Sequence, residues 1–194
     1  FNPDEETGSA GSKKIIADLA RKHDYVFSYE PPDKDAVTVA TNGINGVFLE
    51  VKGRSSHAGS APEDGRNALT ELAHQMVQLK DLGDPAKGTT VNWTMAKAGE
   101  KRNIIPALAT AEADMRYSDL SETDRVLADA QRIAKTSLIA DTQATVRIEK
   151  GRPPLAKNQG SEQLAKTAQQ LYSDIGLNIQ PIAMRFGTDA GYAY

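Results

Sequence analysis

The alternation of apolar patterns between Gly43 and Lys150 constrains the fold more than any other feature of this sequence. Strand-like runs alternate there with segments whose apolar residues recur at helical spacing. Strands are predicted at residues 44–51, 89–97, 107–117 and 142–150, and helices at residues 67–82 and 121–137. This order, βαββαβ, is typical of a ferredoxin-like α+β sandwich.

The segments on either side of the predicted sandwich follow a different pattern. The first contains a helix with one apolar face, for which Ser9 or Ser12 is available as the N-cap. A short, largely buried strand is predicted at Tyr25–Tyr29, and it ends at the prolines after Glu30. The segment after the sandwich contains a predicted helix at residues 161–175, followed by a Gly-Thr-Asp turn. The sandwich is therefore predicted as a complete unit inserted between two incomplete flanks.

Composition excludes several classes of function. A net charge of −3 and a pI near 5.7 argue against nucleic-acid binding through bulk electrostatics. No apolar run approaches the roughly 18 residues that a membrane-spanning helix needs. The chain has no cysteine, so disulfides and thiolate metal sites are excluded. Any metal ion would be held by carboxylates and imidazoles.

Three glutamates are candidates for metal or acid–base chemistry. Glu5 and Glu6 are adjacent, so one carboxylate can bind a cation while the other acts as a general base on a metal-bound water. The structural alternative is that this acidic pair complements the dipole of the following helix. Glu30, placed at the predicted strand end before a proline, is similarly ambiguous.

His57 is a candidate for a functional role. It lies among small residues, Ser55–Pro62, in a loop between a predicted strand and a predicted helix. Small neighbours allow a close backbone approach to a ligand and leave the imidazole free. The alternative is a surface histidine without a function.

Asn103 and Arg116 are candidates for substrate binding. Asn103 lies between two predicted strands, where it can also simply close a loop. Arg116 lies near the end of a predicted strand, and its guanidinium can hold a carboxylate through two hydrogen bonds. Alternatively it pairs with Asp114 or another acid.

The motifs together resemble those of a known family. They are, in chain order, Asn2-x-Asp4-Glu5-Glu6-x-Gly8-Ser9, Glu30-Pro31, Ser56-His57-Ala58-Gly59, Asn103-Ile104-Ile105-Pro106, Asp114-x-Arg116 and Gly187-Thr188-Asp189-Ala190. This sequence resembles the co-catalytic zinc exopeptidases, which include aminoacylases, succinyl-diaminopimelate desuccinylase and glutamate carboxypeptidase. Within that family, Val91–Gly99 and Lys150–Pro154 are most similar to bacterial folate-hydrolysing glutamate carboxypeptidases.

The resemblance implies roles for the candidate catalytic residues. Glu5 matches the general base that activates a zinc-bridging water. Glu6 matches a ligand of one zinc ion, and Glu30 a ligand of the other. His57 matches a histidine that stabilises the carbonyl oxyanion in the active site of the partner protomer.

The resemblance also implies a substrate with a C-terminal carboxylate, namely an N-acyl-glutamate of the folate type. Asn103 and Arg116 match residues that hold the substrate, and Arg116 would grip its terminal carboxylate. Arg152 and the turn at Gly187 and Thr188 match secondary substrate contacts.

For the organisation of the chain, the resemblance implies a lid or dimerisation domain at residues 43–153. This domain would form a homodimer, and residues 1–42 and 154–194 would be fragments of the α/β catalytic domain. The family also has a His-x-Asp motif and a bridging Asp upstream, and a further His downstream, which this sequence does not contain. We therefore expect the two Zn²⁺ ions of the intact enzyme not to bind tightly to this fragment, and we expect the fragment to be inactive.

Two alternative functions remain open from the sequence. One is an N-acyl amino acid deacylase of the same family, and the other is a dimerisation module without chemistry. Folate-hydrolysing relatives are typically exported to the periplasm, so the resemblance favours export, and a cytoplasmic location remains an alternative.

Overall fold

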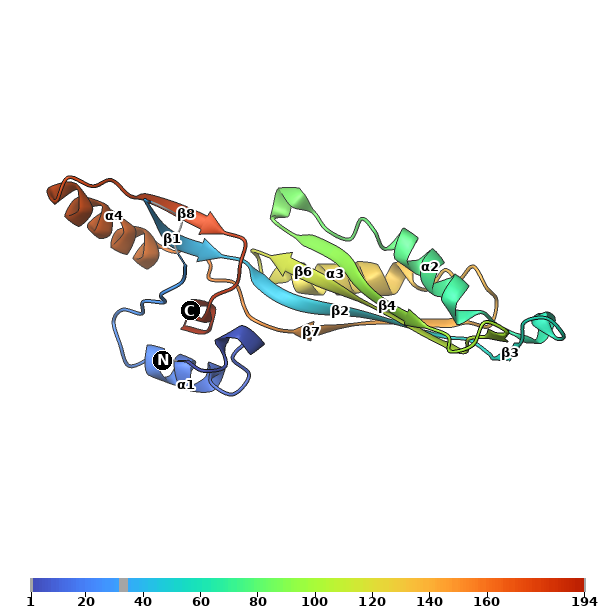
Figure 1. The fold of residues 1–194 in the computed structure, drawn as a ribbon. Coiled ribbons are helices and arrows are strands. Elements are labelled where there is room, and N and C mark those ends of the chain that lie inside the picture. Colours follow the sequence, from blue (N-terminus) through green and yellow to red (C-terminus); the bar gives the residue numbers. More distant parts are fainter. Residues whose placement is uncertain (1, 32–34, 194) are drawn as a thin grey trace. The chain divides into compact units, whose positions relative to one another are not determined.

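A computed structural model of the chain describes residues 2–31 and 35–193 (Figure 1). The chain divides into two compact units. Unit 1 comprises Phe1–Ile44, Tyr117–Leu120 and Gly151–Tyr194, and unit 2 comprises Asn45–Arg116 and Ser121–Lys150. Within the described ranges, no helix is both long enough and apolar enough to cross a membrane.

Unit 2 is built on a four-stranded sheet with the strand order β4-β6-β2-β7 (Figure 1). These strands are β2 (Gly43–Lys52), β4 (Thr90–Ala98), β6 (Leu108–Tyr117) and β7 (Gln143–Lys150). β2 pairs antiparallel with β7, and β4 pairs antiparallel with β6. Buried residues alternate with partly exposed ones along β2 and β6, so one face of the sheet carries the core and the other faces outward.

Two helices supply the other half of the unit 2 core. α2 (Ala68–Gln78) contacts β4, and α3 (Ser121–Ile133) contacts β7. The N-terminus of α2 is capped by Asn67, whose side chain accepts hydrogen bonds from the backbone amides of Leu69 and Thr70. The core side chains include Val47, Leu49, Val51, Leu72, Leu79, Met115, Val126 and Val146. The observed element order agrees with the predicted βαββαβ alternation.

A buried carboxylate ties α3 to the segment before β4. The Glu122 side chain is 4% exposed and lies 2.7 Å from Arg125 Nη2. It also accepts a 2.8 Å hydrogen bond from the Thr89 hydroxyl. The hydrogen bonds from Arg125 hold the pKa of Glu122 well below its usual value, at about 2.

The low pKa of Glu122 predicts an acid-sensitive contribution to stability. A carboxyl whose pKa is depressed in the folded state stabilises the fold above its unfolded pKa, and this contribution is lost as the pH falls through the folded pKa. We therefore expect the Glu122→Gln variant to lose about 2 kcal/mol of unfolding free energy at pH 7 and almost none near pH 2. Urea unfolding across that pH range measures the difference. The exposed Glu63→Gln variant is the control, and a Glu122 effect that does not change with pH would contradict the prediction.

Unit 1 is smaller and more irregular. β1 (Ala36–Thr41) and β8 (Gln180–Met184) form a two-stranded parallel sheet, against which α4 (Gln159–Asp174) packs. α1 (Lys13–Ala20) contacts the 3₁₀ helix η4 (Asp189–Ala193). This unit holds the segments that carry Glu5, Glu30 and Thr188.

Several predictions about the flanks were wrong. Tyr25–Tyr29 is not a strand, because no described segment pairs with it and Tyr29 is 94% exposed. Glu30 is therefore at the end of an irregular segment and not of a strand. The pair β1–β8 was missed. β8 contains Pro181, which argues against a strand in a sequence pattern.

The predicted helices also have different bounds in the structure. The helix predicted at 67–82 ends at Gln78, and the helix predicted at 121–137 ends at Ile133. The helix predicted at 161–175 begins earlier, at Gln159, because the Asn158 side chain caps it by accepting a hydrogen bond from the Ser161 amide.

Candidate active-site residues

Glu5 is held at two atoms by Arg152. Glu5 and Glu6 lie in the 3₁₀ helix η1 (Glu5–Thr7), which follows Asp4. Arg152 Nη1 lies 2.6 Å from Glu5 Oε1, and Arg152 Nη2 donates a 2.6 Å hydrogen bond to the Glu5 carbonyl oxygen. The Arg152 side chain is only 8% exposed, so this contact is shielded from solvent. The predicted base is thereby restricted in both its backbone and its side chain.

Glu30 is supported by two hydroxyl groups. Thr188 Oγ1 donates a 2.7 Å hydrogen bond to Glu30 Oε1, and Thr188 is itself 2% exposed. Ser28 Oγ lies 2.9 Å from Thr188 Oγ1 and 3.4 Å from Glu30 Oε1. Hydrogen bonds from the protein thus orient Oε1, whereas Oε2 has no hydrogen-bond or ion-pair partner among the described residues. Metal-binding carboxylates are commonly oriented by such hydrogen bonds.

Glu6 is exposed, and its side chain takes part in none of the hydrogen bonds or ion pairs found within residues 2–31 and 35–193. In the same ranges, no three His, Asp or Glu side chains lie close enough together to hold a metal ion. Protein-bound zinc takes about four ligands, of which three or four come from side chains. The chemistry of Glu6 and of the oriented Glu30 suits a zinc ion, but these two carboxylates do not make a complete site.

His57 lies in a short antiparallel pair at one end of unit 2. β3 (Ser56–His57) pairs with β5 (Ile104–Ile105), with His57 opposite Ile104. The backbone amides of Gly59 and Ser60 both donate 3.1 Å hydrogen bonds to His57 Nδ1. A ring nitrogen that accepts two hydrogen bonds carries no proton, so Nε2 carries it in the neutral imidazole. The exposed ring therefore presents an N–H donor outward.

Asn103 is brought next to His57 by the same pair. The Asn103 carbonyl oxygen accepts a 2.9 Å hydrogen bond from the Ala58 amide, immediately after His57. The Asn103 side chain is exposed. The two predicted residues therefore share one end of unit 2 and are held in register by backbone hydrogen bonds.

Arg116 lies at the other end of unit 2. It is opposite Thr90 near the end of β6, about 25 Å from Leu108 at the usual rise of a strand. Its Nε and Nη2 donate hydrogen bonds of 2.8 and 3.0 Å to the Asp114 carboxylate. Its Nη1 has no partner among the described residues, and the side chain is 32% exposed. The pairing with Asp114, one of the two alternatives from the sequence, is present.

Each of the two units holds several of the predicted residues. Glu5 contacts Arg152, and Glu30 contacts Thr188, both within unit 1. His57 lies beside Asn103 in unit 2, and Arg116 lies at the opposite end of that unit. Gly187 packs against Arg152, since a Cβ at Gly187 would lie 3.1 Å from Arg152 Cδ.

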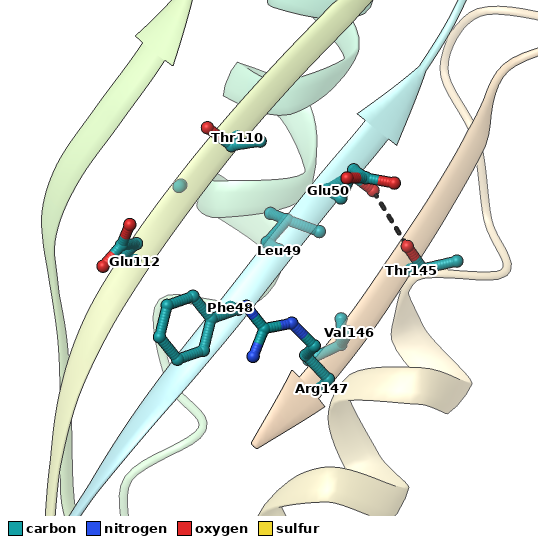
Figure 2. Close-up of a pocket in the computed structure, with 9 residues that line it drawn as sticks. Phe48, Leu49, Glu50, Thr110, Glu112, Thr145, Val146 and Arg147 are labelled. Carbon is teal, nitrogen blue, oxygen red and sulfur yellow. Dashed lines mark hydrogen bonds between the residues drawn. The ribbon is translucent and has the colours of Figure 1, made fainter. Parts of the chain in front are cut away.

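A shallow pocket on the open face of the unit 2 sheet contains none of the predicted residues (Figure 2). Arg147 and Phe48 form a cation–π contact in this pocket, with the guanidinium carbon 3.9 Å from the ring centroid. Arg147 also pairs with Glu149, and Lys52 pairs with Glu50. The pocket is therefore the space between paired side chains on the solvent-facing side of the sheet.

Ser28 and Asp189 were not among the predicted site residues, and Ser9 was considered only as a helix N-cap. Asp189 accepts hydrogen bonds from Ser9 and Asn2, and it lies 3.5 Å from Arg152 Nη2. Ser9 and Ser28 lie near the candidate glutamates in the sequence, and Asp189 belongs to the Gly187–Ala190 motif, but no local signal indicated that Asp189 contacts the loop from Asn2 to Ser9.

The family profile described as a peptidase dimerisation domain matches residues 39–142. The chain belongs to the M20 peptidase family. It is similar to carboxypeptidase G2 of Pseudomonas sp. strain RS-16, with 37% identity over the whole chain and over 47% of that relative. It is also similar to a p-aminobenzoyl-glutamate hydrolase homolog of Haemophilus influenzae, with 38% identity over 46% of this chain and 21% of that relative. This M20 chain therefore spans about half of the length of carboxypeptidase G2.

Solved structures show the same fold. Aminopeptidase PepT from Bacillus cereus superimposes with a TM-score of 0.79 and 21% identity, over 98% of this chain and 51% of the other. A tripeptidase from Staphylococcus aureus superimposes with a TM-score of 0.73 and 25% identity, over 97% of this chain and 50% of the other. The M20 chain is thus a mixed α/β protein that contains the dimerisation domain of this family.

Proposed function

We propose that this M20 chain is a fragment of a zinc-dependent exopeptidase that hydrolyses a C-terminal glutamate amide. The observation that carries this proposal is the 37% identity to carboxypeptidase G2 along the whole chain. The similarity to p-aminobenzoyl-glutamate hydrolases supports an acyl-glutamate substrate. Glu6 and Glu30 would each contribute a ligand to the two zinc ions, which supply Lewis acidity when bound. The other ligands would come from segments that this chain does not contain.

In this proposal Glu5 is the general base. Its carboxylate takes a proton from the attacking water and later delivers a proton to the leaving amine. The 2.6 Å contact with Arg152 Nη1 supports this role, because a base acts efficiently only from a fixed position. Arg152 therefore acts chiefly on Glu5, and its part in substrate binding, together with that of Gly187 and Thr188, is secondary.

Arg116 would bind the terminal carboxylate of the substrate. Asp114 occupies the Nε edge of its guanidinium and restrains its orientation. The Nη1 donors remain directed away from Asp114 and can bind a carboxylate. Asn103 would donate a hydrogen bond to the acyl part of the substrate.

His57 would act in the active site of the partner protomer. The scissile carbonyl of an acyl-glutamate is only a few bonds from the carboxylate that Arg116 would hold. His57 and Arg116 of one chain lie at opposite ends of unit 2. His57 is opposite Ile104, beyond the Leu108 end of β6, and Arg116 is about 25 Å from Leu108, so the two residues do not fit one such substrate. A second copy of the chain would supply His57, whose Nε2–H would donate to the oxyanion.

The same domain would form the homodimer. We infer a ferredoxin-like lid at residues 43–153, with residues 1–42 and 154–194 belonging to the catalytic domain. β4 is an edge strand of the sheet. Val77 of the neighbouring α2 and Met95 of β4 are 66% and 61% exposed. An edge strand flanked by exposed apolar side chains is suited to pairing with a second copy.

Substrate profiling tests the proposed function. The longer protein is one that includes this chain and also spans the part of carboxypeptidase G2 that this chain does not match. It is expected to release glutamate from folate and from p-aminobenzoyl-glutamate in the presence of zinc. The 194-residue chain alone is expected to release none. Hydrolysis of acetylated amino acids without glutamate release would instead favour an N-acyl amino acid deacylase. That alternative draws support from the similarity to an indole-3-acetyl-aspartic acid hydrolase, 34% identical over 40% of this chain.

A further inference from the structure

Asp189 is the point at which three segments of unit 1 meet. Its Oδ2 accepts a hydrogen bond from Asn2 Nδ2, and its Oδ1 accepts one from the Ser9 hydroxyl. Asn2 Nδ2 also donates a 2.9 Å hydrogen bond to Ser9 Oγ. These contacts close the loop from Asn2 to Ser9, which contains Glu5 and Glu6, onto the turn at Asp189.

The backbone at Ser9 supports the importance of this closure. Ser9 has a φ of 56°, in the left-handed region that disfavours residues other than glycine, and it is fully buried. Such a conformation persists only where surrounding contacts enforce it. The hydrogen bond from the Ser9 hydroxyl to Asp189 is a contact that does so. The loop is therefore held in a costly conformation by a carboxylate far away in the sequence.

Asp189 also contacts the arginine that restrains the proposed base. Arg152 Nη2 lies 3.5 Å from Asp189 Oδ1 and donates to the Glu5 carbonyl oxygen at 2.6 Å. The side chain of Asp189 is 13% exposed and that of Arg152 is 8% exposed. With one acidic partner at Nη1 and another at Nη2, the guanidinium is restrained in position. Without the charge of Asp189, Glu5 would be the only acidic partner of Arg152 among the described residues.

We propose that Asp189 is a positioning residue that fixes Glu5 and Glu6, through Ser9 and Arg152, in the arrangement that hydrolysis requires. This inference rests on the proposed function for the roles of Glu5 and Glu6. Asp189 does not act on the substrate itself. It acts through the loop from Asn2 to Ser9, and its removal misplaces the carboxylates while the substrate-binding groups of unit 2 stay unchanged.

Hydrogen–deuterium exchange of the 194-residue chain tests the positioning without any metal or substrate. In the Asp189→Asn variant, the amides of Thr7, Gly8 and Ser9, which donate hydrogen bonds within the loop, are expected to exchange at least about tenfold faster. The amides of β2 are expected to keep their rates. The Asp18→Asn variant, which removes an exposed ion-pair partner on α1, is the matched control and is expected to leave the loop unchanged. Equal loop exchange in wild type and Asp189→Asn would overturn the proposal.

Steady-state kinetics of the longer protein test the consequence for the reaction. Asp189→Asn is expected to lower kcat at least about tenfold per folded molecule and to change KM less than about twofold. Ser9→Ala is a second variant, which is expected to lower kcat by a smaller factor and likewise to leave KM nearly unchanged. The double variant is expected to be no worse than Asp189→Asn alone, because both changes remove one contact. A purely structural role would lower the unfolding temperature and leave kcat per folded molecule intact, and would overturn the proposal.

The two possible failures are distinguishable. If the wild-type protein releases no glutamate, the proposed function fails, while the exchange measurement still decides whether Asp189 holds the loop. If the wild type is active and Asp189→Asn keeps both the wild-type kcat and the wild-type exchange rates, the positioning role fails and the proposed function stands.

Discussion

Replacing Glu5 with Gln in the longer protein is expected to lower kcat for glutamate release by about 10³-fold, within the range by which a positioned general base accelerates a reaction. Gln has nearly the same size and can still accept a hydrogen bond from Arg152, so the loop is expected to keep its conformation. It cannot take a proton from water. KM is expected to change little, because the substrate-binding groups are elsewhere. Glutamate release from folate at saturating substrate measures the effect.

The control for Glu5→Gln is Glu63→Gln, which alters an exposed carboxylate in the 3₁₀ helix η2 (Pro62–Asp64). This variant is expected to retain wild-type kcat. Circular dichroism and thermal unfolding of the Glu5→Gln variant establish that it folds. A Glu5→Gln enzyme with more than about a tenth of the wild-type kcat would remove Glu5 from the role of general base.

Mixing two inactive variants is expected to restore activity if His57 acts across the dimer. The His57→Ala homodimer is expected to lose about 10²- to 10³-fold in kcat, as for the loss of one oxyanion donor. In a heterodimer of His57→Ala and Glu5→Gln, one active site combines Glu5 from one protomer with His57 from the other. After random exchange of protomers, about a quarter of the wild-type activity is expected, because half of the dimers are mixed and each has one intact site.

The activity of the mixture shows whether His57 acts in its own protomer or in the partner protomer. If His57 acted in its own protomer, every active site in the mixture would carry one defect, and activity would stay at the level of the separate variants. His74→Ala is the matched histidine control, because His74 lies on α2 and contacts only Gln78 among the described polar partners. It is expected to retain full activity. A strictly monomeric protein in sedimentation would contradict the proposed arrangement as well.

The regular part of the fold followed from local patterns. β2 alternates between buried and partly exposed residues because one face of an antiparallel sheet packs on helices and the other faces water. The sequence shows this alternation only at Val47, Leu49 and Val51, because the apolar Ile44 and Phe48 lie on the opposite face of the strand. The helical spacing of apolar residues in α2 and α3 is present directly in the sequence. The flanks were less predictable, because the pairing of β1 with β8 joins residues about 140 positions apart and includes Pro181.

The candidate site was predictable residue by residue, and its contacts were not. The motif at Asn2–Ser9 identified Glu5 as a candidate base, but nothing local indicated that Arg152 restrains it. The small residues around His57 predicted an accessible imidazole. The tautomer came only from the positions of the Gly59 and Ser60 amides.

The sequence by itself determined the family of the chain, the βαββαβ order and the identity of the candidate catalytic residues, because periodicity and short motifs are local properties. Only the tertiary structure decided which groups meet. It brought Asp189 and Arg152 into contact with the loop that carries Glu5, and it placed His57 and Arg116 at opposite ends of one unit. Contacts between distant segments depend on strand pairing and packing, which are set by the whole fold and not by any single motif.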